Sequence, residues 1–126
     1  MVIAVGTPVR QDDFSYTVTR VAKHRQTENI AYEVTIRVDN HAKIVDYQWR
    51  DAIACVSDAA GRLYRAHPNP HDGSDHPPIA AGSSAEYTLT FVLPATAQRP
   101  TLRYSNGILM GDVFDGAAYR RAAIPL

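Results

Sequence analysis

Cysteine is almost absent from this chain, because Cys55 is the only one among 126 residues. A single thiol cannot close an internal disulfide, and it cannot supply the several thiolates that structural zinc or iron–sulfur sites need. The fold must therefore be held by its core, and a chain of this length buries roughly two-thirds of its unfolded surface. Since Cys55 lies in an apolar run without a local activating charge, we expect a buried, unreactive thiol.

The chain also lacks an excess of charge of either sign, with thirteen basic and thirteen acidic residues. Balanced charge gives no overall field that would draw a protein to nucleic acid, so we expect no nucleic-acid partner. No apolar run approaches the ~20 residues of a membrane span, and the apolar start at residues 1–6 is too short for a signal-peptide core. We therefore expect no membrane span, and the residues alone leave the compartment open.

Glutamate and lysine are scarce, at three and two residues, whereas aspartate occurs ten times. Glu and Lys favour helix faces and Asp favours turns, so this composition disfavours a helical protein. Catalytic patterns are missing as well: the chain has no G-x-S-x-G, no G-x-x-x-x-G-K, and no His or Met just after Cys55 that would complete a copper site. We predict that the protein is not an enzyme and has no catalytic residues.

The pattern that the chain does contain is a repeated alternation of apolar and polar residues. In the clearest example Tyr32, Val34 and Ile36 face one way while Glu33 and Thr35 face the other, as in a half-buried strand. The same reasoning predicts strands at 14–21, 30–39, 52–56, 62–65, 85–92 and 101–104, with a last strand near 108–114 or 119–124.

Seven or eight short strands separated by turns predict an all-β fold, an immunoglobulin-like antiparallel β-sandwich that forms one domain over residues 1–126. Trp49 is expected in the core between the sheets, in preference to an exposed aromatic platform with Tyr47, Tyr64 and Tyr104. The predicted core contains Phe14, Tyr16, Val18, Tyr32, Val34, Ile36, Val38, Ile53, Leu89 and Phe91.

One loop, residues 67–78, differs from the rest in composition, being rich in Pro, His and Asp. Prolines remove backbone donors, so this segment is expected to be an exposed loop. Imidazole and carboxylate groups bind Zn²⁺, Ni²⁺ or Cu²⁺, so the loop is a candidate site for weak divalent-metal binding. The alternative is a solvated loop in which Asp and Gly form turns. The candidate ligands are His67, His71, Asp72, Asp75 and His76.

The order of several motifs resembles a family of bacterial secreted and lipoprotein domains of unknown function, whose sandwich is similar to that of the mycobacterial immunoprotective extracellular antigen. The motifs lie at residues 5–6, 32–40, 57–64, 81–84 and 87–94. The resemblance implies an immunoglobulin-like fold, a secreted or cell-envelope location, and a role in binding or envelope structure. It supplies no catalytic residues to transfer.

We therefore expect a non-catalytic binding or structural module. Its function would lie on loops or exposed strand edges, where a protein partner or a second copy of the chain can bind. The alternative is a weak metal-binding domain that uses the loop from His67 to His76.

Overall fold

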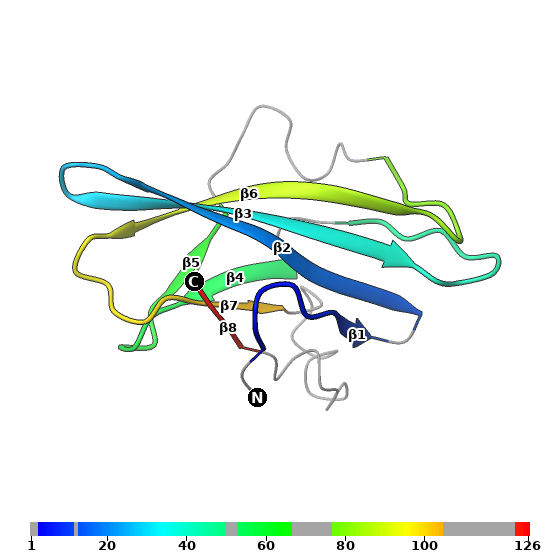
Figure 1. The fold of residues 1–126 in the computed structure, drawn as a ribbon, viewed down its shortest axis with the longest axis horizontal. Helices are drawn as coiled ribbons and strands as arrows, with labels where there is room; N and C mark the ends of the chain where they lie inside the picture. The colour runs from blue at the N-terminus through cyan, green and yellow to red at the C-terminus, as the bar shows by residue number, and fades with distance from the viewer. Residues whose placement is uncertain (1–2, 12, 50–52, 67–76, 105–122) are drawn as a thin grey trace.

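The computed structural model describes residues 3–11, 13–49, 53–66, 77–104 and 123–126, which form two antiparallel sheets packed face to face (Figure 1). Within these ranges every regular element is a strand, and none is a helix long and apolar enough to cross a bilayer. The strands are β1 (Val9–Gln11), β2 (Phe14–Arg25), β3 (Asn29–Asn40), β4 (Ala54–Ser57), β5 (Leu63–Arg65), β6 (Ser84–Pro94), β7 (Thr101–Tyr104) and β8 (Ile124–Pro125).

The first sheet has the order β1-β2-β3-β6 and is built on three long strands. The register of β2 against β3 shifts between Val18 and Arg20, which makes Thr19 the extra residue of a β-bulge. The bulge lets Val18 and Val21 both lie over β3 on the core side, although two residues and not one separate them. Without the bulge, one of the two would face solvent.

The second sheet has the order β5-β4-β7-β8 and consists of shorter strands. Its alternation is visible in β4, where Ala54 and Val56 are buried while Cys55 and Ser57 are only half-buried. The expectation of a buried Cys55 is therefore wrong. The reason is parity: between two inward residues of a strand, the middle one must face outward.

The core lies between the two sheets and confirms most of the predicted core. Trp49 is 0% exposed and stacks on Tyr87 with ring centroids 5.2 Å apart. Trp49 thus belongs to the core, and the platform alternative is wrong for it and for the buried Tyr104. Of the ten residues predicted for the core, only Phe14 is half-buried at its margin; buried as predicted are Tyr16, Val18, Tyr32, Val34, Ile36, Val38, Ile53, Leu89 and Phe91.

The predicted strands agree with the observed ones apart from their ends and one omission. The short edge strand β1 was not predicted, because three residues after Pro8 carry no detectable alternation. Strand β2 continues to Arg25, past the predicted end at Val21. The prediction ended too early because the bulge at Thr19 interrupts the alternation of apolar and polar residues. Of the two alternatives for the last strand, 108–114 lies outside the described residues. The other, 119–124, is described only from residue 123, and β8 there covers Ile124–Pro125.

Candidate functional site

A groove of about 610 Å³ runs along the outer edge of β6. One wall is the segment 77–80, which includes Pro77, Pro78 and Ile79, and the other is the stretch from Ser83 to Thr88. The groove is therefore bounded on one side by the exposed Pro77, Pro78 and Ala80 with the buried Ile79 among them, and on the other by the start of a strand.

Backbone groups of β6 point into this groove. In an antiparallel pair, residues bonded to the partner strand alternate with residues whose N–H and C=O face away from it. The amide of Asn40 donates to the Ser83 carbonyl, and the pairing register extends this pattern along β6. Ser84, Glu86 and Thr88 consequently direct their backbone groups away from β3. No strand in the described part of the chain pairs with this edge.

The apolar wall is held in place by the buried side chain of Asn40. Its amide nitrogen donates to the carbonyls of Val45, at 2.8 Å, and Ile79, at 3.0 Å. Its amide oxygen accepts the backbone N–H of Ala42 at 2.9 Å. Ile79 also exchanges two backbone hydrogen bonds with Tyr47. These bonds fix Ile79, and with it the wall of the groove, to the end of β3.

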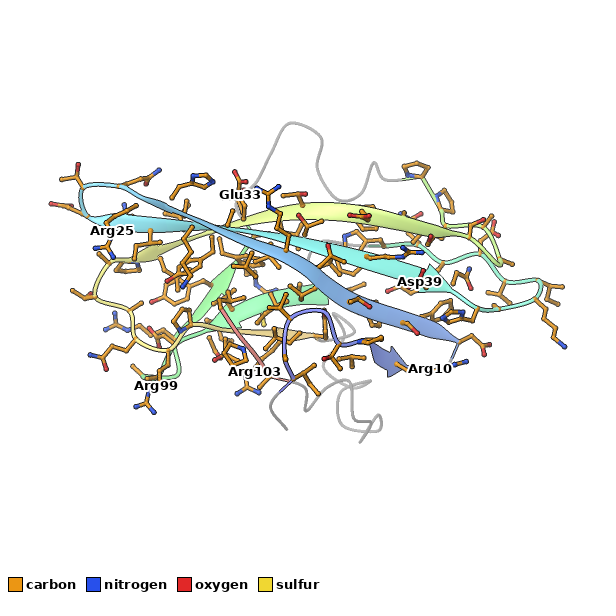
Figure 2. The ribbon with its side chains drawn as sticks, viewed as in Figure 1. Arg10, Arg25, Glu33, Asp39, Arg99 and Arg103 are labelled. Atoms are coloured by element: carbon orange, nitrogen blue, oxygen red, sulfur yellow. The ribbon has the colours of Figure 1, made fainter. Side chains whose placement is uncertain are left out.

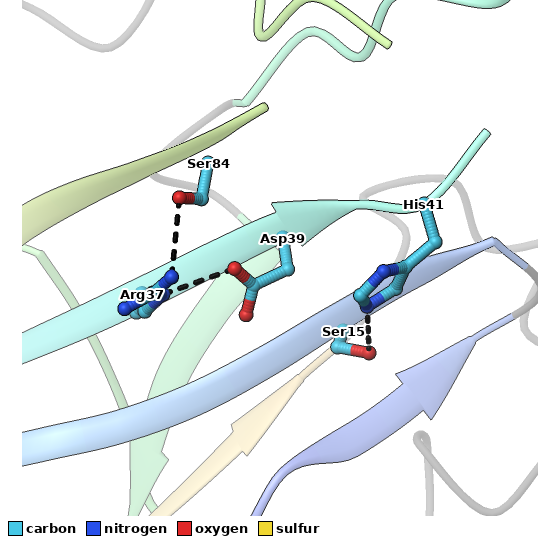
Figure 3. A network of polar contacts seen from close by, with 5 residues as sticks. All are labelled: Ser15, Arg37, Asp39, His41 and Ser84. Carbon is cyan, nitrogen blue, oxygen red and sulfur yellow. Dashed lines mark hydrogen bonds and ion pairs between the residues drawn. The ribbon is translucent and has the colours of Figure 1, made fainter. Parts of the chain in front are cut away.

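A polar network adjoins the same end of the sheet (Figure 3). Arg37 Nε donates to Asp39 Oδ1 at 3.0 Å, and Arg37 Nη2 donates to Ser84 Oγ at 3.3 Å. His41 Nε2 lies 3.1 Å from Ser15 Oγ. These contacts place charge-assisted hydrogen-bonding groups beside the groove, where they can contact a bound partner.

The Ser15–His41 pair does not form a catalytic triad. Such a triad needs a carboxylate that orients the histidine, and among the described residues none is hydrogen-bonded to His41. The nearby Asp39 carboxylate is bound to Arg37 instead, and Ser15 is only 7% exposed. The pair ties the start of β2 to the end of β3.

Comparison with solved structures places this architecture among bacterial β-sandwich proteins. A secreted protein from Mycobacterium tuberculosis, MPT63, superposes with a TM-score of 0.63 at 14% identity, over 86% of this chain and 91% of its own. An uncharacterized β-sandwich protein from Clostridium difficile 630 gives 0.65 at 7% identity, over 99% and 93%. The yjhA protein from Bacillus subtilis gives 0.61 at 16% identity, over 98% of each chain.

No protein-family model matches the sequence, and no curated protein matches it. At these low identities the structural matches establish the fold. The expected similarity to a mycobacterial secreted protein is thus confirmed as a similarity of fold.

The predicted metal ligands His67, His71, Asp72, Asp75 and His76 lie outside the described residues. Elsewhere, in the ranges that the structure does describe, no group of three or more His, Cys, Asp or Glu side chains could hold a metal ion. The hypothesis for the loop therefore stays a prediction.

Sequence reasoning missed the groove along β6. The predicted strand 85–92 and the turn before it were correct signals for an edge, but nothing local shows which strands have only one neighbour. In the sequence, Asn40 is simply the last residue of the motif at 32–40. A buried Asn at the end of an apolar strand could have indicated a side chain that organises the following loop.

Proposed function

We propose that this protein is a non-catalytic, exported single-domain module that binds an extended segment of a partner protein along the outer edge of β6. The observation that carries the proposal is the groove beside Ser84, Glu86 and Thr88, into which their backbone groups point. An added strand would hydrogen-bond to these groups, and its alternate side chains would pack against the apolar wall.

The wall supports the proposal because it is fixed before a partner arrives. Ile79 is held by Asn40 and Tyr47, so binding need not order this side of the groove. A wall fixed in advance lowers the entropic cost of association. Prolines 77 and 78 contribute further rigid apolar surface.

Charge favours a different protein over a second copy of this chain. Glu86 is exposed and is the only charged side chain among the described residues that line the groove. A twofold pairing of two β6 edges centred on Glu86 would set two carboxylates opposite each other, which is destabilising. We therefore propose a partner segment with a Lys or Arg opposite Glu86 and apolar residues on either side.

Export is proposed on the resemblance to secreted bacterial domains and on the shared fold with the secreted MPT63.

The proposal can be tested with a library of ten-residue peptides displayed on phage, followed by fluorescence anisotropy with the selected peptides. Thr88→Pro removes an edge N–H without removing a backbone hydrogen bond to β3, whereas Thr88→Val keeps that N–H. Both variants lose the Thr88 hydroxyl and its hydrogen bond to Thr35 Oγ1, so the comparison isolates the N–H. We expect at least tenfold weaker binding to Thr88→Pro and a change within twofold for Thr88→Val.

Glu86→Lys provides a second readout, because it should shift the selected peptides from basic to acidic ones. Equal affinity of the Thr88→Pro and Thr88→Val variants, or a selection that yields no saturable binder, would contradict the proposal.

A further inference from the structure

The second sheet carries a concentration of arginines that the groove on β6 does not involve. Its strands and their connecting segments, over 53–66, 95–104 and 123–126, contain four arginines and one acidic side chain. The acid is Asp58, and the arginines are Arg62, Arg65, Arg99 and Arg103. Arg99 and Arg103 project on the same side of the molecule (Figure 2).

Two of these arginines line a shallow groove of about 230 Å³, together with Ser57, Thr101 and the Asp58–Ala59 turn. Ser57 and Thr101 are cross-strand partners of β4 and β7, so both hydroxyls belong to one row of the sheet. Arg103 Nε donates to Ser57 Oγ at 3.2 Å. The Arg103 bond orients its guanidinium over the sheet, while its two terminal nitrogens make no hydrogen bond to any described residue.

The backbone of Arg99 adopts a conformation that an arginine disfavours. Its φ is 51°, and no other residue apart from glycine has a positive φ in the described ranges. A side chain with a Cβ atom is strained in this region, and the following Pro100 further favours an extended conformation. Glycine would fit with less strain. Strain of this kind that places a charged side chain in a groove is typical of a binding site.

The single acid in the groove does not neutralise it. Asp58 Oδ1 accepts the backbone N–H groups of Ala60 and Arg62, each at 3.0 Å, and Oδ2 accepts the Tyr64 hydroxyl at 2.9 Å. The carboxylate is thus occupied within its own hairpin. Arg99 and Arg103 have no carboxylate partner among the described residues.

We propose that this groove binds a phosphate-class oxyanion, with Arg99 and Arg103 as the charged donors and the Ser57 hydroxyl as an additional donor. The Thr101 hydroxyl donates to the Arg99 carbonyl oxygen at 3.1 Å and so holds the backbone of Arg99 at the edge of the groove. Guanidinium groups match the spacing of phosphate oxygens and can bind two of them at once. The oxyanion could be free phosphate or the phosphate of a lipid headgroup, since both present the same oxygens.

A titration of ¹⁵N-labelled protein with sodium phosphate, against sodium chloride at equal ionic strength and pH, tests the site directly. We expect saturable shifts of the backbone signals of Ser57, Ala59, Arg99 and Thr101 with phosphate alone. Sedimentation with phosphatidylglycerol vesicles, compared with phosphatidylcholine vesicles, then distinguishes a lipid headgroup from free phosphate.

Three variants distinguish phosphate binding at this groove from a general effect of the net charge of the protein. Arg99→Gly and Arg103→Gln should each weaken phosphate binding at least fivefold, whereas Arg25→Gln, the same charge change on the other sheet, should leave it within twofold. Arg99→Gly is expected to keep or gain stability, and urea unfolding of this variant separates loss of phosphate binding from loss of the fold. Unsaturable shifts, equal shifts with chloride, or unchanged binding by Arg99→Gly would overturn the proposal.

Discussion

The side-chain amide nitrogen of Asn40 lies 3.0 Å from the carbonyl oxygen of Ile79, and this bond connects the end of the central strand β3 to the wall of the groove on β6. Asn40 is 2% exposed, so its amide has exchanged water for protein partners completely. The partners are backbone groups of the two loops that follow β3 and precede β6. One side chain therefore holds together two loops that are far apart in the sequence.

Replacing Asn40 should destabilise the fold strongly. Asn40→Ala leaves buried backbone groups of Ala42, Val45 and Ile79 without their partner, which we expect to lower the free energy of unfolding by about 2–4 kcal/mol. Urea unfolding followed by circular dichroism measures this change. Asn29→Ala, at the opposite end of β3, is the control and should stay within about 0.5 kcal/mol. Similar losses in both variants would contradict the role assigned to Asn40.

Arg99 should show the opposite behaviour, a gain of stability on replacement. Arg99→Gly removes the strain of a Cβ atom at positive φ, which outweighs the greater freedom of glycine in the unfolded chain. We expect the free energy of unfolding to rise by roughly 0.5–1 kcal/mol. Arg99→Ala keeps the Cβ atom and should show no gain. A glycine variant that is no more stable than the alanine variant would show that the backbone is relaxed.

Asp58 should make the free energy of unfolding depend on pH in the acidic range. Burial works to raise the pKa of Asp58, but hydrogen bonds from the Arg62 amide, the Tyr64 hydroxyl and the Ala60 amide outweigh it, so the pKa lies below the ordinary value of 3.8. A carboxyl whose pKa is depressed on folding stabilises the folded state above its unfolded-state pKa. That contribution is lost as the pH falls through the folded-state pKa.

The comparison of wild type with Asp58→Asn, by urea unfolding from pH 7 down to pH 2, measures this contribution. The difference between the two proteins should be constant near neutrality and should shrink once the pH drops below about 4. A difference that is independent of pH would mean that the three hydrogen bonds do not depend on the charge of the carboxylate.

The loop from His67 to His76 predicts weak binding of a divalent metal ion. Calorimetric titration of untagged protein with Zn²⁺, Ni²⁺, Cu²⁺ and Ca²⁺ should give stoichiometric heat that is lost when His67, His71 and His76 are all changed to Ala. Replacement of His24 and His41, which lie outside the loop, is the matched control and should leave the heat unchanged. Equal heat from the triple variant and the wild type would exclude the loop as the site.

The sandwich could be predicted from the sequence because its strands are buried on one face only. Such a strand has alternating apolar and polar residues, a pattern that is visible within a few positions. The strand β3 illustrates this, since Tyr32, Val34 and Ile36 all face the core as expected. The alternation fails where the backbone departs from ideal geometry. At Thr19 the bulge shifts the register by one residue, so the alternation beyond it no longer indicates where β2 ends.

Neither candidate site could be read from local patterns. The groove on β6 depends on which strand lies at the edge of a sheet, a property of the whole topology. The groove between β4 and β7 depends on the positive φ of Arg99 and on a pairing between segments distant in sequence. The alternation in 101–104 does place Arg103 outward, but its neighbours come from elsewhere in the chain.

The position of β3 between β2 and β6 also sets the order in which this protein can fold. β2 and β3 are joined by a short turn, so their hairpin closes a small loop and can form within microseconds. β4 and β5 lie between β3 and β6 in the sequence, so the pairing of β6 with β3 closes a long loop and is slow. Until then the apolar strand at the centre of the sheet has an open side. If this slow pairing limits the rate of folding, φ-values measured in β3 and β6 should exceed those in β5.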